Sequence, residues 1–284
     1  MVSQCQPLVV EEENIMTIQV GLIGNGGIVL ASDRRVTAKD LKVGEELVGY
    51  AAYIGKLETK IELSQEKNIA ISCADNLTFA RKVAKQIIAE LEADDLADEY
   101  SASGAIERIV RVASSEEGKT AQWLIALKCP DWHLLKCILS PCEVVSELGL
   151  VTITRQPTGT KEQFNASAIP NAEWDVSCAP CRSWDFAGEI TNPAIFWHKY
   201  HDEYLSPGRL IPLAAHLILS AHFFNSKGVD GLDIVQCDAS GVRLLSTSSI
   251  TALQKKSRML NENISEYLFK EEQEYTYAPQ KAEV

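Results

Sequence analysis

The sequence predicts an α+β fold in which two sheets pack against each other and helices cover the outside. Runs of strand-type residues alternate with pairs of helical segments along the chain, an order typical of stacked sheets between helix layers. Strands such as IQVGLI and GIVLAS are apolar on both faces, as expected for a sheet that is buried on both sides.

Two hairpins are expected in the first third of the chain. The apolar runs 17–23 and 28–33 flank an Asn-Gly pair, which is a strong turn signal between strands. The segment 60–73 repeats this design, because KIELS and IAISC are separated by a short polar turn. The stretch 37–59 has no clean period and is predicted to be a variable excursion.

Helical periodicity replaces the strand pattern after this point. Apolar residues recur at helical spacing between Leu77 and Leu91, and Asp75 or Asn76 suits the N-cap position. A second helix is predicted from 103 to 114. The later part of the chain predicts a hairpin of QWLIALK and HLLKCILS, a short strand SWDFAG, helices over 193–204 and 212–224, and a closing hairpin of GLDIVQCD and GVRLLS.

No linker rich in Pro, Gly or Ser divides the chain, so one domain is expected over 17–249. Residues 151–182 show no clear pattern. Residues 1–16 are expected to be a leader or a mis-assigned start that is removed or disordered. Residues 250–284 form a charged C-terminal helix or tail, whose last ten or so residues look disordered.

Composition excludes several classes of function. Lys and Arg total 27 and Asp and Glu total 39, so the net charge of −12 disfavours nucleic acid and anionic membrane surfaces as partners. No apolar run approaches the eighteen residues of a transmembrane helix. The N-terminus lacks the basic region of a secretory signal, so a cytoplasmic protein with mostly reduced cysteines is expected.

The segment MTIQVGLIGNGGIVLASDRR resembles the start of a mature proteasome β-type subunit, with a Thr, a short strand, a Gly-containing turn and Asp-x-Arg. Lys60 then opens the next strand pair, as in that family and its bacterial proteasome-like members. The resemblance covers about 17–249 and is weakest from 140 to 205. It implies the N-terminal-nucleophile (Ntn) hydrolase fold, a four-layer α/β/β/α sandwich.

The resemblance also implies a set of catalytic residues. Thr17 would be the nucleophile, with its own α-amine as the base. Lys60 would place its ammonium beside the Thr17 hydroxyl, and Asp33 would pair with Lys60. The N–H of Cys73, where the family usually has Gly, would receive the oxyanion. Arg35 would support the Asp33 turn or reach across an interface.

This chemistry requires Thr17 to be the first residue of the mature chain. Met16 precedes it, and Met before a small residue is removed by methionine aminopeptidase. We therefore expect translation to begin at Met16, or residues 1–15 to be a short leader. In the alternative, Thr17 stays inside a continuous chain and is only a strand residue.

Two departures from the family pattern keep a second function open. Asn225 replaces the supporting Asp before the closing hairpin, and Glu189 interrupts the family's Gly-Ser-Gly-Ser segment. The chain is thus either a threonine-type hydrolase of peptide bonds or a catalytically inactive structural subunit of a proteasome-like complex. Both imply self-assembly into a ring or homo-oligomer. The active form also implies a polypeptide substrate, with an ATP-dependent unfoldase as a candidate partner.

A zinc site is the main competing interpretation of the cysteines and histidines. Cys178 and Cys181 form a C-x-x-C pair, and His198 and His201 form H-x-x-H. Two such pairs suit tetrahedral zinc, but the histidine spacing is one residue shorter than usual. Packed or surface residues are the favoured interpretation, and no metal or other cofactor is expected.

Overall fold

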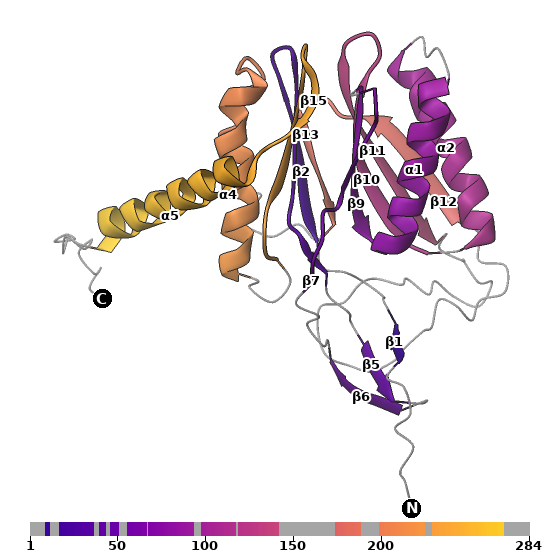
Figure 1. Cartoon of the computed structure of the whole chain (residues 1–284), viewed down its shortest axis with the longest axis horizontal. Coiled ribbons are helices and arrows are strands. Elements are labelled where there is room, and N and C mark those ends of the chain that lie inside the picture. Colours follow the sequence, from indigo (N-terminus) through magenta and orange to yellow (C-terminus); the bar gives the residue numbers. More distant parts are fainter. Residues whose placement is uncertain are drawn as a thin grey trace, which may run out of the picture.

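Two five-stranded antiparallel sheets stack face to face at the centre of the protein (Figure 1). The computed structural model describes residues 9–11, 17–36, 40–43, 46–50, 56–66, 68–93, 98–117, 119–141, 174–188, 199–224 and 229–269.

The first sheet contains two predicted hairpins, the one near residue 17 and the closing one near residue 244. Its order is β13 (Trp184–Gly188), β2 (Ile18–Gly24), β3 (Gly27–Ser32), β14 (Asp233–Asp238) and β15 (Gly241–Leu244). Strands β2 and β3 pair antiparallel, and their turn contains Gly26 with a φ of 79°. Nearly every residue of these two strands is buried. The predicted pairing and its burial on both faces are therefore confirmed.

The second sheet has the order β12 (Trp174–Pro180), β11 (Trp132–Pro141), β10 (Ala121–Lys128), β9 (Ile69–Asp75) and β8 (Ile61–Leu63). The predicted hairpins β8–β9 and β10–β11 are present. Strand β12 lies within 151–182, where the sequence showed no pattern. It is an edge strand in which only Val176 and Cys178 are buried, so its apolar signal is weak.

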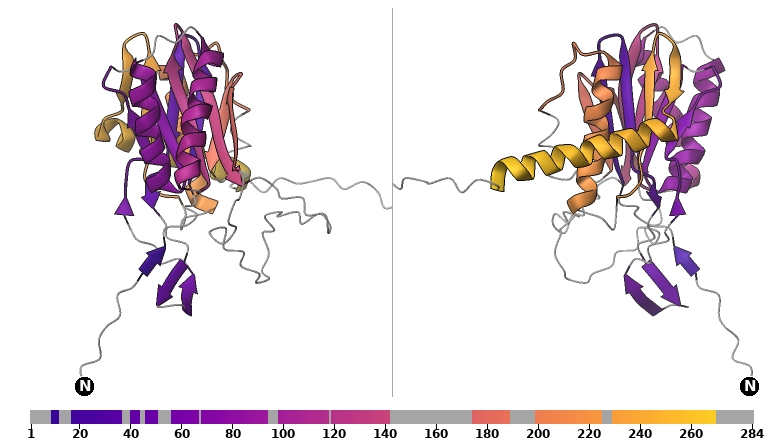
Figure 2. Two further views of the ribbon diagram at one scale, coloured as in Figure 1. Left: turned by 90° about the vertical axis from the view of Figure 1, so that its right-hand side faces the viewer. Right: turned by 60° about the vertical axis from the view of Figure 1, so that its left-hand side comes forward.

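Helices cover the outer face of each sheet. They are α1 (Leu77–Ala93), α2 (Glu99–Glu116), α4 (Pro207–Phe224) and α5 (Thr247–Phe269). Helices α1 and α2 lie on the second sheet, α4 lies on the first, and α5 crosses α4 (Figure 2). The order of layers is α/β/β/α, so the predicted four-layer sandwich is confirmed.

Helix boundaries differ in part from those predicted. The Asn76 carboxamide accepts the Phe79 N–H at 3.0 Å, as an N-cap should. Helix α2 begins at Glu99 because Asp98 caps it, with its carboxylate accepting the Ser101 N–H at 2.7 Å. Helix α4 starts at Pro207, five residues before the predicted start at Pro212. The predicted helix 193–204 is not seen over 199–204, which contains turns, and its remainder lies outside the described residues.

Shorter strands lie outside the sandwich. Strand β4 (Arg35–Val36) pairs with β7 (Lys56–Leu57), and β5 (Asp40–Val43) pairs with β6 (Glu46–Tyr50). Strand β1 (Val9–Glu11), within the segment expected to be a leader, pairs with β5. Strands β5, β6 and β7 fall within the segment 37–59 that was predicted to be variable, and β4 ends just before it. None of the described helices is both long and apolar enough to span a bilayer.

Candidate active site

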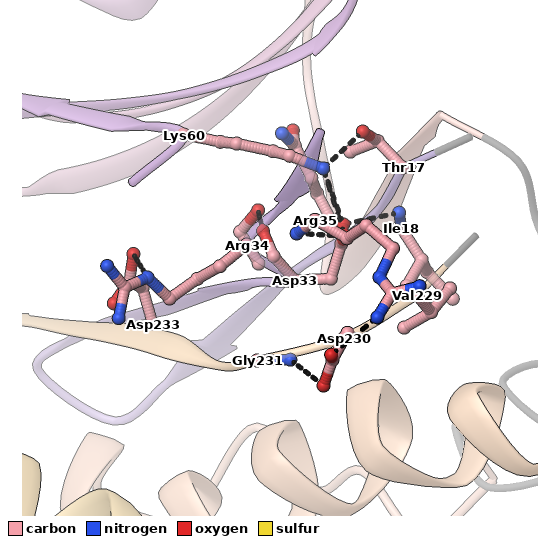
Figure 3. A network of polar contacts seen from close by, with 12 residues as sticks. Thr17, Ile18, Asp33, Arg34, Arg35, Lys60, Val229, Asp230, Gly231 and Asp233 are labelled. Atoms are coloured by element: carbon pink, nitrogen blue, oxygen red, sulfur yellow. Dashed lines mark hydrogen bonds and ion pairs between the residues drawn. The ribbon is translucent and has the colours of Figure 1, made fainter. Parts of the chain in front are cut away.

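Thr17, Asp33 and Lys60 come together at one end of the first sheet (Figure 3). The Lys60 Nζ lies 2.6 Å from the Thr17 Oγ1. The same nitrogen lies 3.0 Å from the Asp33 Oδ1 and 2.9 Å from its Oδ2. A single ammonium is thus in hydrogen-bond contact with a hydroxyl and with both oxygens of a carboxylate.

Backbone pairing places all three residues. Thr17 directly precedes β2 and Asp33 directly follows β3, so the β2–β3 ladder brings them to the same end of the sheet. The Ile18 N–H donates to the Asp33 Oδ1 at 3.1 Å, and the Arg35 N–H donates to its Oδ2 at 3.1 Å. Lys60 directly precedes β8 and reaches across from the second sheet.

The three side chains are almost completely removed from solvent. Thr17 is 1% exposed, and Asp33 and Lys60 are both 0% exposed. Burial raises the pKa of Asp33 to about 6, although Lys60 and the two backbone N–H groups oppose this rise. Burial likewise lowers the pKa of Lys60, which the Asp33 charge opposes. The pair can therefore exchange protons closer to neutral pH than free side chains do.

Gly188 packs against the backbone of Thr17 from the neighbouring strand. Its φ is 81°, a conformation that favours glycine. A Cβ at this position would lie 2.1 Å from the Thr17 carbonyl oxygen, so no larger residue fits. Gly188 lies in the segment that the resemblance aligns with the family's Gly-Ser-Gly-Ser, but its contact with Thr17 was not predicted.

A second ion pair lies on the outer side of the same turn. The Arg35 guanidinium contacts the Asp230 Oδ2 at 2.7 Å, and Gly231 donates its N–H to the Asp230 Oδ1 at 2.8 Å. Asp230 was not predicted. The side chain of Arg35 thus binds Asp230 within the same chain, and the backbone N–H of Arg35 supports the Asp33 turn.

The oxyanion role expected for Cys73 does not fit its surroundings. Its N–H donates to the Lys60 carbonyl at 2.8 Å as part of the β8–β9 pairing. Its side chain belongs to the core beneath α1 and α2 and is fully buried. The N–H of Cys73 is therefore already committed to a backbone partner.

The remaining predicted residues lie apart from this cluster or outside the described residues. Asn225, Glu189 and His198 belong to the latter group. The Cys181 thiol lies 3.7 Å from an Asp185 oxygen, and the His201 Nε2 lies 2.6 Å from the Ile23 carbonyl. Within the part of the chain that is described, no group of three or more His, Cys, Asp or Glu could hold a metal ion.

Comparisons with known proteins identify the fold. No family model and no curated protein sequence matches the chain. Solved structures do match. Anbu (ancestral beta-subunit) from Yersinia bercovieri has a TM-score of 0.60 at 11% identity, over 92% of this chain and 100% of that chain. The Gly-1 mutant of Anbu from Hyphomicrobium sp. strain MC1 has a TM-score of 0.58 at 14% identity, with the same coverage.

These matches correct the resemblance drawn from the sequence. Another Anbu structure from the Hyphomicrobium strain matches with a TM-score of 0.57 at 14% identity, over 91% of this chain and 100% of that chain. All three are described as Anbu proteins, a family distinct from the proteasome β-type subunits that the N-terminal segment resembles. Identities of 11–14% establish the fold alone. The chain has the proteasome-related fold of the Anbu proteins.

Proposed function

We propose that the chain is a threonine-type hydrolase of amide bonds, with Thr17 as its nucleophile after removal of the residues before it. One observation carries the proposal: the Lys60 ammonium contacts both the Thr17 hydroxyl and the Asp33 carboxylate in a fully buried cluster. In this proposal residues 17–249 form the catalytic domain. Cleavage of the Met16–Thr17 bond creates the α-amine that the chemistry needs.

The proposed reaction begins with attack of the Thr17 hydroxyl on an amide carbonyl. The hydroxyl proton passes to the α-amine of Thr17, whose ordinary pKa of about 7.7–8.0 leaves a useful neutral fraction near pH 7. The protonated amine then gives its proton to the leaving amine as the tetrahedral intermediate collapses. Water hydrolyses the resulting ester on Thr17, and the α-amine again removes the proton.

Lys60 and Asp33 prepare the hydroxyl for this attack. An ammonium 2.6 Å from the Thr17 Oγ1 favours the ionised oxygen over the neutral one. The same charge favours a neutral α-amine nearby. Asp33 keeps Lys60 charged and aimed at Thr17, because a buried ammonium without a counter-charge would lose its proton.

Covalent labelling tests the proposal. Protein expressed from Met16 should carry Thr17 at its N-terminus by intact mass. That protein should react with a peptide epoxyketone or a β-lactone at Thr17, whereas protein that keeps residues 1–15 should not. Thr17→Ala should abolish labelling. Thr251→Ala changes an exposed threonine on α5 and should leave labelling unchanged.

The same experiment decides against the alternative function. If the protein begins with Thr17 but neither labels nor cleaves any peptide in a broad library, the hydrolase proposal fails. The chain would then be a catalytically inactive structural subunit of a larger assembly.

We also propose that the chain assembles with copies of itself through α1 and α2. On α2, Tyr100 is 71% exposed and Val112 is 64% exposed, and large apolar side chains of this kind are enriched at protein interfaces. Light scattering should give a mass well above 31.3 kDa at micromolar concentration. A stable monomer under these conditions would contradict the proposal.

A further inference from the structure

Asp75 has an unusual backbone conformation at the junction of β9 and α1. Its φ is 67°, and it is the one residue other than glycine with a positive φ among those described. It is also buried, with 8% of its surface exposed. Residues with a side chain adopt this conformation at a cost in free energy, although Asp tolerates it better than most. Such outliers concentrate at functional sites.

The positive φ redirects the Asp75 side chain. Cys73 faces the helices and Ala74 faces the other sheet, so strand alternation would return Asp75 to the helix side. Instead, the Asp75 Oδ2 accepts a hydrogen bond from the Gln122 Nε2 at 3.0 Å. Gln122 lies on β10 between Ala121 and Trp123, which both face the helices. Its side chain therefore lies on the other face of the sheet, towards the first sheet.

Gln122 connects Asp75 to the neighbourhood of Thr17. The Gln122 Oε1 accepts the Gly188 N–H at 3.3 Å. A Cβ on Gly188 would lie 2.1 Å from the Thr17 carbonyl oxygen and 3.5 Å from the Thr17 Cβ. The chain of contacts thus runs from the end of β9, across the space between the sheets, to the backbone of Thr17.

We propose that Asp75 and Gln122 are positioning residues that hold Gly188 against Thr17, an inference that rests on the proposed hydrolase function. An ionised carboxylate only accepts hydrogen bonds, so Asp75 requires the NH2 of the Gln122 amide to face it. The amide oxygen must then face Gly188. Without Asp75 the amide can turn over and present its NH2 to the Gly188 N–H, which removes the hydrogen bond that holds this strand end.

Two substitutions at Asp75 separate positioning from backbone strain. Asp75→Gly relieves the strained φ, keeps the backbone N–H and removes the carboxylate. Asp75→Asn keeps a side chain that tolerates positive φ and an acceptor oxygen. Because a small misplacement of a reacting group has a large kinetic cost, we expect Asp75→Gly to slow β-lactone labelling of Thr17 by about 10- to 100-fold. Asp75→Asn should recover most of that rate.

The thermal unfolding midpoint and amide exchange provide readouts apart from labelling. Asp75→Gly should unfold at the same or a higher temperature than the parent protein, because the strain is gone. The Gly188 amide should exchange faster in Asp75→Gly and in Gln122→Ala. Gln236→Ala is the matched control, since Gln236 donates to Asp238 at 2.6 Å and pairs opposite Val29, towards the other end of the sheet.

Each result either supports or overturns the inference. Unchanged labelling and unchanged Gly188 exchange in Asp75→Gly would overturn it. If the losses of labelling rate are additive in the Asp75→Gly, Gln122→Ala double variant, the inference is also overturned. The effects of substituting two residues in one connected network of contacts should not add. If the parent protein fails to label at all, the hydrolase proposal fails, while Gly188 exchange still reports whether the contact chain holds this strand end.

Discussion

The Lys60–Asp33 pair is completely buried, whereas the Arg35–Asp230 pair, which starts two residues beyond Asp33, is partly exposed. Their closest N–O distances are similar, at 2.9 Å and 2.7 Å. The side chains of the first pair have no exposed surface, while those of Arg35 and Asp230 are 20% and 40% exposed. Distance alone therefore does not distinguish the two pairs, but burial does.

We propose from this comparison that the inner pair serves the chemistry of Thr17 and that the outer pair serves local structure. A buried ion pair loses hydration of both charges, and an apolar replacement of similar volume is often equally stable. A partly exposed pair costs little and contributes about 0.2–1 kcal/mol. The inner pair also contacts the Thr17 hydroxyl.

Lys60→Met should have the largest effect of any single substitution at the two pairs. It leaves the Asp33 carboxylate buried with its two backbone donors but without the Lys60 charge. The free energy of unfolding at pH 7 should fall by about 3–5 kcal/mol, as for other broken buried pairs. Thr17 labelling should be lost. Urea denaturation and β-lactone labelling measure the two effects.

A double substitution provides the control for this prediction. Lys60→Met combined with Asp33→Asn removes both charges, so most of the lost stability should return. Thr17 labelling should stay absent, because no ammonium faces the hydroxyl. If the double variant is as unstable as Lys60→Met, the inner pair is needed for stability after all. The division between the two pairs would then be wrong.

The raised pKa of Asp33 predicts opposite pH dependences for stability and reactivity. Its pKa is about 6 in the folded protein, against an ordinary value of 3.8 for an aspartate in the unfolded chain, so folding favours the protonated form. The contribution of Asp33 to the free energy of unfolding is therefore fully present below pH 3.8 and is lost as the pH rises through 6. The loss amounts to about 3 kcal/mol, because each pKa unit corresponds to about 1.36 kcal/mol. Labelling requires ionised Asp33 and should rise over the same range.

Asp33→Asn isolates this titration from those of other carboxyl groups. The difference in unfolding free energy between the parent protein and Asp33→Asn should shift in favour of the variant between pH 4 and pH 7. The variant should also lack the rise in labelling near pH 6. A stability difference that does not change with pH would show that Asp33 keeps an ordinary pKa.

Sequence patterns were sufficient to predict strands and helices where apolar periodicity and turn residues agree. The hairpin of β2 and β3, the hairpin of β10 and β11, and the helix beginning at Leu77 follow from apolar spacing and turn residues. The approach of Thr17 to Lys60 was expected only from the resemblance. No local pattern specifies which strand ends meet across two sheets.

Other features depend on contacts that no local pattern encodes. Strand β12 was missed because only Val176 and Cys178 are buried along it. Cys73 was assigned to the site by the resemblance, as the position where the family usually has Gly, but the direction of its N–H depends on pairing with β8. Asp75 looked like an ordinary N-cap, and its positive φ becomes visible only in the folded chain.

Substitution of the outer pair should have the smallest effect. Arg35→Gln removes the guanidinium that contacts Asp230 but keeps the backbone N–H that donates to Asp33 at 3.1 Å. The loss in unfolding free energy should be below about 1 kcal/mol, as for other partly exposed pairs. Thr17 labelling should stay within about twofold, because the inner cluster keeps all its contacts. Asp230→Asn should have similarly small effects on stability and labelling, because it removes the charge but keeps an oxygen that can accept the Gly231 N–H. A tenfold loss of labelling in Arg35→Gln would mean that the outer pair sets the position of the Asp33 turn, so that the two pairs act as one unit.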